Sequence, residues 1–579
     1  MLSSFIAMIQ IVADNIISGL GRDTGENLRA LREGRISLKE NAGFRVPGDG
    51  KVFLSVMDDS FIEPSVHEED MTRLEMFMVS SVKRACGRIS HLLGDSSTIF
   101  VFSTAKGNVR YLAEDERKVP LWHSAKVVSG YFGNPNDPVT VSTACTSGVT
   151  AIIIAKRLLE AGLYKTAVVV GADEITEFVV SGFASLMALS DELCRPFDIM
   201  RHGLNLGEAA GCLVLRRADS KEDMLNQDGY FKTPQLVASG AMASDAFHIS
   251  GPSKTGEGLY RAVMKTLSLP YGTKAETCLG EAFINPHGTA TLYNDQMESV
   301  AFSRSGLDDL PMIPLKGYFG HTLGASGVIE TILCCHFLDE GWIPGAAGYS
   351  EPGCFPSPNI SSEPQAVSAS WFLKTNSGFG GSNAAIKVEK LGDSFPENGS
   401  RSGKIDIRTI KSFNLEYTGD VKEYLASLYR DSGLSYPKFH KMDLLCKAGV
   451  LAADSLLEVT DGNSDTALVF VNSVSSLAAD REYLSSIAED DFFPSPSVFV
   501  YTLPNIVTGE ISIRHKLFGE CVFFVEEELN RERALDYVRC LFREGSVSRV
   551  LFCWDESLDG RCSLRADLIG MEKNGKLRV

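Results

Sequence analysis

The 579-residue sequence lacks the features that mark several large classes of protein. No apolar run is long enough to span a bilayer. The N-terminal apolar run has no basic region of the signal-peptide type before it, and Asp14 interrupts it, so we interpret it as an early strand. Basic residues are also scarce: 56 Lys and Arg stand against 74 Asp and Glu, a net charge of −18. We therefore expect no membrane span and no nucleic acid as a partner, because a general nucleic-acid binder needs a basic surface.

Paired cysteines of the metal-binding kind are also absent. The 13 cysteines are odd in number and scattered, with no two of them in a CxxC spacing. In a chain of this length, such usage is typical of reduced thiols and argues against a disulfide framework. We therefore expect a cytoplasmic protein with no metal site.

Strand-like and helix-like patterns alternate along most of the chain, which favours an α/β layered fold. The clearest unit has a strand over residues 139–144, a helix over 147–162 and a second buried strand over 166–174. The centre of the helix, residues 151–155, is entirely apolar, which predicts burial on all sides. The three segments together predict a strand–helix–strand crossover.

Residues 392–404 are rich in Gly, Ser, Pro and charge, and we predict a linker there between domains 1–391 and 405–579. The second domain weakly echoes the first. The run from Thr466 is laid out like the run from Thr98, and residues 526–528, all Glu, fall where the first domain has its Thr-Ala-Cys turn. Two interpretations stay open: a degenerate, non-catalytic repeat of half of the first domain, or an unrelated α/β domain.

Cys145 is the first candidate for chemistry, because it falls where the buried strand turns into the buried helix. A helix N-terminus lowers the pKa of a thiol and stabilises the attacking thiolate. Its neighbours are small and leave room for a substrate. Most cysteines, however, are only buried apolar residues.

Two histidine motifs favour an active site around Cys145. His287 follows an apolar strand in INPHGTATLYND, and His321 lies in PLKGYFGHTLGASGVIE together with Lys316 and Glu330. There are only ten histidines, and these two stand at strand–turn junctions followed by small residues. A lone histidine is usually structural, but two such junctions and a cysteine turn indicate a site.

A glycine-rich loop, TNSGFGGSNAAI, adds a third signal around Phe379 and Gly380. Glycines let backbone N–H groups approach a ligand closely, and one of them could complete an oxyanion hole with the N–H of Cys145. A plain glycine turn is the alternative.

These motifs, TACTSG, NPHGTAT, KGYFGHTLGASG and SGFGGSN, occur in this order and resemble those of the β-ketoacyl-ACP synthases of the elongating Cys-His-His type. The resemblance covers residues 1–391. It implies a thiolase-like α-β-α-β-α layered fold built from two similar halves, to which residues 405–579 add a further α/β domain. It also implies a homodimer or a heterodimer with a related ketosynthase.

The resemblance assigns the roles of residues. Cys145 would carry an acyl group from an acyl-carrier protein, and His287 and His321 would promote decarboxylation of a malonyl thioester. The remaining residues would assist: Lys316 and Glu330 would support the histidines, Thr289 and Thr291 would hold the phosphopantetheine arm, and Phe379 and Gly380 would line the substrate site. No cofactor is implied beyond that arm.

The chain also departs from the family pattern. The stretch between Ser103 and Cys145 is short, and ALSDELC (188–194) is acidic where basic residues often meet the carrier protein. Arg195, Arg201 and Lys254 remain candidates for that contact. A non-catalytic or chain-length-setting partner subunit is the alternative function, although such relatives normally lose the cysteine. Acyl length and pathway, whether fatty-acid or polyketide, stay open.

Overall fold

The computed structural model describes residues 7–46, 50–66, 69–220, 223–224, 230–275, 281–392, 405–458, 466–488, 492–558, 560–573 and 576–577. The predicted linker, residues 392–404, lies outside these ranges except for Gly392. The first strand, β1 (Met8–Ser18), confirms the interpretation of the N-terminal apolar run. Among the described residues, no helix combines the length and the apolar character needed to cross a membrane.

A 15-stranded sheet organises the molecule, with the order β10-β13-β14-β9-β1-β8-β6-β4-β5-β17-β16-β18-β19-β15 and β20 paired to β19. Its strands after β1 are β4 (Thr98–Ser103), β5 (Val139–Val141), β6 (Thr166–Asp173), β8 (Ala209–Ala218), β9 (Gln235–Ser244), β10 (Ala282–Asn285), β13 (Trp371–Gly378), β14 (Ser382–Lys390), β15 (Ile407–Thr418), β16 (Thr466–Asn472), β17 (Cys521–Val525), β18 (Arg549–Leu558), β19 (Arg561–Lys573) and β20 (Lys576–Leu577).

One strand arrangement occurs three times in this sheet. In the first copy β4 is parallel to β6, β6 is antiparallel to β8, and β8 is antiparallel to β1. The order β10-β13-β14-β9 repeats these relations, and so does β16-β18-β19-β15. The first two copies are the two similar halves predicted for residues 1–391. The third copy lies in residues 405–573, so the C-terminal segment has the layout of one half.

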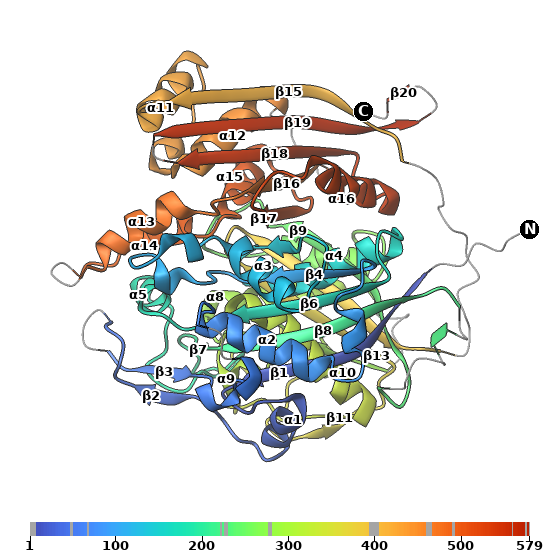
Figure 1. Cartoon of the computed structure of the whole chain (residues 1–579). Coiled ribbons are helices and arrows are strands. Elements are labelled where there is room, and N and C mark those ends of the chain that lie inside the picture. Colours follow the sequence, from blue (N-terminus) through green and yellow to red (C-terminus); the bar gives the residue numbers. More distant parts are fainter. Residues whose placement is uncertain are drawn as a thin grey trace, which may run out of the picture.

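Helices separate and cover these layers (Figure 1). The helices used below are α2 (Arg73–Ala85), α3 (Leu121–Tyr131), α4 (Ser147–Glu160), α5 (Glu177–Ser185), α7 (Glu257–Thr266), α8 (Leu292–Ser305), α10 (Ser326–Glu340), α12 (Leu444–Leu456), α13 (Leu477–Ser486), α14 (Pro496–Tyr501), α15 (Ile506–His515) and α16 (Arg531–Glu544).

Helices α4 and α10 form the middle layer, because both contact strands of the first half and strands of the second. Every residue of α4 except Glu160 is buried, which confirms the prediction from its apolar centre. Gly148 and Gly327 let the two helices approach each other: a Cβ on Gly148 would lie 2.8 Å from the Gly327 backbone. Helix α2 covers the outside of the first half and α7 the outside of the second.

The predicted strand–helix–strand unit is present, but its elements end earlier than predicted: α4 ends at Glu160 and not at Gly162, and β6 ends at Asp173 and not at Glu174. Strand β5 ends at Val141 and not at residue 144, because the chain turns sharply before α4 and Ala144 takes a left-handed conformation (φ 52°). A non-glycine residue in this region carries a cost of roughly 1–2 kcal/mol. This strained turn immediately precedes Cys145.

The C-terminal segment continues the main sheet through β17, which runs antiparallel to β5 (Figure 1). Phe524 is the register partner of Val141, and the amide of Ser142 donates to the carbonyl of Phe523 over 3.0 Å. The edge of β5 is therefore already covered by a strand of the same chain.

A buried ion network reinforces this contact. Arg157 on α4 donates to Glu520 (2.6 Å), to Glu544 (2.8 Å) and to the hydroxyl of Tyr537 (2.8 Å), all in the C-terminal segment. The side chain of Arg157 is only 2% exposed. Because a buried cation needs such partners, separating the two parts would be costly.

Candidate active site

Cys145 occupies a tight turn between β5 and α4. Its neighbours hold this turn: the amide of Thr143 donates to Ser147 Oγ (2.8 Å), Ser147 Oγ donates to the carbonyl of Ala144 (2.6 Å), and Asn376 Nδ2 donates to the carbonyl of Cys145 (2.7 Å). These hydrogen bonds hold the backbone of the turn, and with it the position of the thiol.

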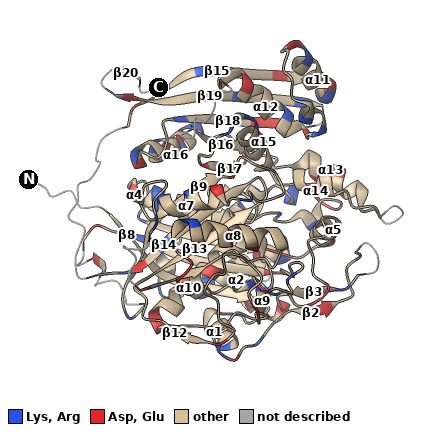
Figure 2. Cartoon of the chain, turned by 180° about the vertical axis from the view of Figure 1, so that it is seen from behind, with Lys and Arg blue, Asp and Glu red and all other residues tan. Residues whose placement is uncertain are grey.

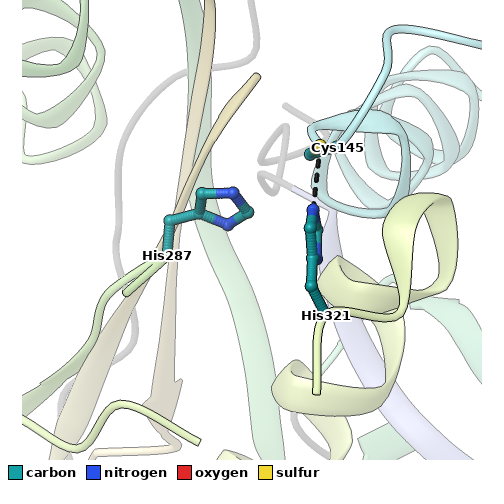
Figure 3. A group of neighbouring side chains, drawn as sticks. All are labelled: Cys145, His287 and His321. Carbon is teal, nitrogen blue, oxygen red and sulfur yellow. Dashed lines mark hydrogen bonds between the residues drawn. The ribbon is translucent and has the colours of Figure 1, made fainter. Parts of the chain in front are cut away.

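His321 lies beside the thiol, with Nε2 3.0 Å from Cys145 Sγ (Figure 3). Gly320, just before it, has φ 74°, and a Cβ there would lie 2.7 Å from the Leu206 backbone. Glycine is thus required for the turn that places the histidine. The amide of His321 donates to the carbonyl of Asn205 over 2.7 Å, which fixes the backbone of the ring-bearing residue.

His287 points toward the same space from the end of β10 (Figure 3). Its ring centroid lies 5.0 Å from that of His321, edge to face. Glu298 on α8 accepts from the amides of His287 and Gly288 at 2.7 Å each. Lys316 Nζ donates to the carbonyl of His287 at 2.6 Å, so the backbone of His287 is held at both its amide and its carbonyl.

Glu330 pairs with two buried ammonium groups beside the histidines. It binds Lys316 over 2.8 Å and forms a short contact with Lys374, and all three side chains are at most 1% exposed. Sequence reasoning found Lys316 and Glu330 but missed Lys374. The signal was a lysine inside the otherwise apolar start of the WFLKTNSG strand. It also missed Glu298 and Asp295, which cap the turn after His287.

The two imidazoles are held neutral. Burial lowers the pKa of His287 well below its usual 6.5, and Lys316, His321 and Lys374 lower it further. Burial, Lys316 and Lys374 do the same to the pKa of His321. For Glu330, burial raises the pKa, but the two lysines outweigh it and keep the pKa below its ordinary value. The site therefore combines neutral imidazoles with a charged, paired carboxylate.

The expected lowering of the thiol pKa by the start of the helix does not fit the structure. Burial raises the pKa of Cys145 to about 12, and Lys316 offsets only part of this. Cys145 also precedes the first residue of α4 by two positions. The raised pKa favours the thiol form, whose hydrogen-bond partner is His321 Nε2.

A cavity of about 410 Å³ opens beside the three residues. Thr289 and Thr291 line it with their hydroxyl oxygens 3.0 Å apart, and Phe379 lines it as well. Gly380 does not: its amide already donates to the carbonyl of Ile249 at 2.6 Å. A Cβ on Gly378 would lie 3.1 Å from the amide nitrogen of Cys145, so the loop backbone passes close to that amide.

The three carrier-protein candidates have different surroundings. Arg201 is buried and donates to the carbonyls of Asp198, Gly353 and Leu292, so it supports the fold and is not available at the surface. Arg195 is 39% exposed and lies 3.5 Å from Glu192, and Lys254 is exposed. Along the ribbon in Figure 2, the positions of acidic and basic residues are interspersed.

The three side chains could also be considered as metal ligands, because their donor atoms lie within 4.8 Å of one another. Cysteine and histidine bind zinc at about 2.0–2.3 Å, which sets donor atoms roughly 3.3–3.8 Å apart in a tetrahedral site. Here Cys145 and His321 are 3.0 Å apart, the distance of a hydrogen-bonded pair. The arrangement fits proton transfer better than it fits metal binding.

The C-terminal segment touches the loop that faces Cys145. Asn505 Nδ2 donates to the carbonyl of Phe379 over 2.8 Å. A Cβ on Gly380 would lie 2.6 Å from Asn505, and one on Gly509 would lie 2.6 Å from the Gly380 carbonyl. A segment predicted to lie outside the chemistry therefore helps to shape the wall of the site.

Comparison with known proteins gives two family matches within the chain. Residues 123–221 match the family described as beta-ketoacyl synthase, N-terminal domain, and residues 235–350 match its C-terminal domain. The chain is 30% identical over 273 residues to a putative mitochondrial 3-oxoacyl-[acyl-carrier-protein] synthase of Schizosaccharomyces pombe, covering 44% of this chain and 61% of that protein. It is 33% identical over 269 residues to the tetracenomycin polyketide synthase ketoacyl synthase alpha subunit of Streptomyces glaucescens, covering 44% and 60%. The chain thus spans about three fifths of these relatives.

Solved structures extend the likeness in fold. A ketosynthase (ApeO) in complex with its chain length factor (ApeC) from Xenorhabdus doucetiae matches with a TM-score of 0.57 and 24% identity, over 66% of this chain and 98% of that chain. The PfaC keto synthase–chain length factor matches with a TM-score of 0.74 and 12% identity, over 98% of this chain and 78% of that chain. These matches confirm the predicted thiolase-like fold, and the second also includes the C-terminal segment.

Proposed function

Because the chain carries the N-terminal and C-terminal domains of the β-ketoacyl synthase family, we propose that it is a condensing enzyme. It joins an acyl group held on Cys145 to malonyl-acyl-carrier protein, giving 3-oxoacyl-acyl-carrier protein and CO2. The observation that carries the proposal is the Cys145–His321 contact of 3.0 Å with His287 beside it, all facing one cavity.

The first half of the reaction loads the enzyme. Cys145 Sγ attacks the acyl thioester as its proton passes to His321 Nε2, and the carrier thiol leaves with a proton. The amides of Cys145 and Phe379 are the proposed donors to the developing oxyanion. The Gly380 amide is excluded from this role because it is bound to Ile249.

The second half breaks a C–C bond. The malonyl thioester loses CO2, and its electrons form an enolate whose oxygen is stabilised by hydrogen bonds from His287 and His321. Neutral imidazoles can serve in this step, since each keeps one ring N–H that can donate to the growing negative charge. The enolate carbon attacks the Cys145 thioester, the new C–C bond forms, and the thiolate leaves and takes up one proton.

The carrier arm and the second subunit complete the proposal. Thr289 and Thr291 would bind the phosphopantetheine arm, and no other cofactor is required. Since β17 covers the edge of β5, residues 405–573 take the place that a second subunit would otherwise fill at this edge. A non-catalytic partner role is disfavoured, because a cysteine and two neutral histidines lie together in contact geometry.

The test is intact-mass spectrometry of the protein mixed with acyl and malonyl forms of an acyl-carrier protein. We expect the acyl mass on the wild type and none on Cys145→Ala. His287→Ala and His321→Ala should impair CO2 release more than loading in single-turnover assays. An acyl group carried by another cysteine, or unchanged CO2 release in both histidine variants, would refute the proposal.

A further inference from the structure

Ser326, the first residue of α10, lies beside the ring of His321. Its Oγ is 3.4 Å from His321 Nδ1, whereas the other ring nitrogen, Nε2, faces Cys145 Sγ at 3.0 Å. The same Oγ lies 3.2 Å from Oε1 of Glu330, which follows one turn further along the helix. The serine side chain is fully buried. One buried hydroxyl therefore contacts both the imidazole beside the thiol and the carboxylate of the lysine cluster.

The hydrogen of this hydroxyl decides which nitrogen of His321 is protonated. A serine hydroxyl has one hydrogen, so it can donate to only one of its two neighbours. Burial raises the pKa of Glu330, but Lys316 and Lys374 outweigh burial and keep the carboxylate charged, so it can only accept. When Ser326 donates to Glu330, its oxygen accepts from His321 Nδ1. The ring then carries its hydrogen on Nδ1, and Nε2 faces the thiol as an acceptor.

The second imidazole of the site has no such support. His287 Nδ1 is buried, and among the residues that the structure describes it has no hydrogen-bond partner. No neighbouring side chain therefore fixes the tautomer of His287 from that nitrogen. Of the two rings, only that of His321 has a hydroxyl at Nδ1 to assign its hydrogen. This asymmetry favours different duties for the two histidines.

We infer that Ser326 is a positioning residue: by donating to Glu330, it holds His321 as the tautomer whose Nε2 accepts the proton of Cys145 during loading. The inference deepens the proposed function and rests on it, because it assumes that Cys145 is acylated. The thiol proton passes to Nε2 and then to the departing thiolate, so the ring returns to its first tautomer. In the acylated enzyme the hydroxyl can turn to Nδ1. One proton then leaves Nδ1 and one joins Nε2 through water in the cavity, which supplies the N–H that the enolate needs.

The experiment uses the full-length Ser326→Ala variant in single turnover. Loading of Cys145 is measured by intact mass with acetyl and hexanoyl thioesters of N-acetylcysteamine, and CO2 release from malonyl-acyl-carrier protein is measured on enzyme already loaded. Without the hydroxyl, the buried Nδ1–H has no acceptor among the described side chains, so the hydrogen moves to Nε2. Loading, and alkylation of Cys145 by iodoacetamide, should both slow by about five- to tenfold, as expected for the loss of one hydrogen bond. CO2 release should change by less than about twofold, since the ring still offers an N–H at Nε2.

A double variant separates positioning from a general disturbance of the turn. In a His321→Ala background, Ser326→Ala should slow loading further by less than about twofold, because the ring through which it acts is gone. A merely structural role would multiply the two losses. The matched control is Ser305→Ala, the same change at a fully buried serine of α8 whose hydroxyl donates to the carbonyl of Ala301 at 2.9 Å. It should leave both steps unchanged.

Three results would overturn the inference about Ser326: loading of Ser326→Ala at the wild-type rate, equal slowing of loading and CO2 release, or a full additional loss in the His321→Ala background. Equal slowing of loading by Ser305→Ala would also count against it. If the wild type itself gains no acyl group on Cys145, the failure falls instead on the proposed function.

Discussion

Glu330 is the single anion between two buried ammonium groups, and its replacement by glutamine gives the sharpest test of the site's electrostatics. The change keeps the size of the side chain and removes its charge. Lys316 and Lys374 would then face each other with no carboxylate between them, and both are at most 1% exposed. Removing one partner of a buried ion pair costs about 3–5 kcal/mol, because the remaining charge stays out of water.

The net charge of the cluster predicts a smaller loss of stability when Lys374 is replaced. With Lys374→Met, the pair Lys316–Glu330 remains and the cluster is neutral, so the loss of stability should be the smaller of the two. In the double variant Glu330→Gln, Lys374→Met, Lys316 is the one unpaired lysine of the cluster, whereas Glu330→Gln alone leaves both lysines without their carboxylate. Its loss of stability should therefore fall short of the sum of the single losses by about 1–3 kcal/mol.

The assay is urea unfolding of the three variants at neutral pH, with CO2 release from malonyl-acyl-carrier protein measured in parallel. Because the pKa of Glu330 is lowered in the fold, its contribution to stability is present above its unfolded value of about 4.3 and is lost as the pH falls through the folded value. If Glu330→Gln costs no more than Lys374→Met, and if the two losses add, then charge compensation does not explain this cluster.

Three further predictions concern the rest of the site. Since the pKa values of His287 and His321 lie well below 6.5, the rate of decarboxylation should stay level from about pH 8 to about pH 6. The folding stability, in contrast, should fall as the pH drops below about 6.5, because the unfolded chain then binds protons that the buried rings do not. A decarboxylation rate that falls by half near pH 6.5 would contradict this prediction. Asn505→Ala should slow acylation of Cys145 by up to about tenfold at unchanged overall fold, measured by mass in single turnover, because the Phe379 loop loses a hydrogen bond. A chain ending near Gly392 should aggregate, as measured by size-exclusion chromatography, because the edge of strand β5 becomes exposed. A truncated protein that is monodisperse and still loads Cys145 would show that the segment is dispensable.

The fold was predictable where local pattern and burial coincide. The apolar centre of α4 and the two flanking strands gave the crossover, because a helix that is apolar on all sides must lie between layers. The positions of Cys145, His287 and His321 followed from small residues at strand ends. The three side chains meet as expected, since turns at strand ends of one layered fold face a common space.

The features that the sequence did not predict are contacts between residues that lie far apart in the chain. Lys374 lies far along the chain from Glu330, and only the folded sheet brings it to the carboxylate. The raised pKa of Cys145 has the same origin, because the helix start is visible in the sequence and the burial that outweighs it is not. The contact of Asn505 with the first domain was equally hidden, as nothing in its own segment marks it as part of a site.

The three copies of the strand arrangement show which parts of the unit carry chemistry. The loop from β5 to α4 and the loop from β17 to α16 both have five residues, 142–146 and 526–530. The first contains Cys145, and the second contains Glu526, which pairs with Arg533 at 2.8 Å. Counted from the end of the strand, the position of Cys145 in the first loop corresponds to Leu529 in the second, so the second loop has no thiol at this position. What the third copy keeps is the strand that pairs with β5, the partners of Arg157 and Lys106, and the side chains that reach a small cavity beside Cys145. These are the surfaces that face the first domain, which is consistent with the expectation that this unit supports a site in the first domain.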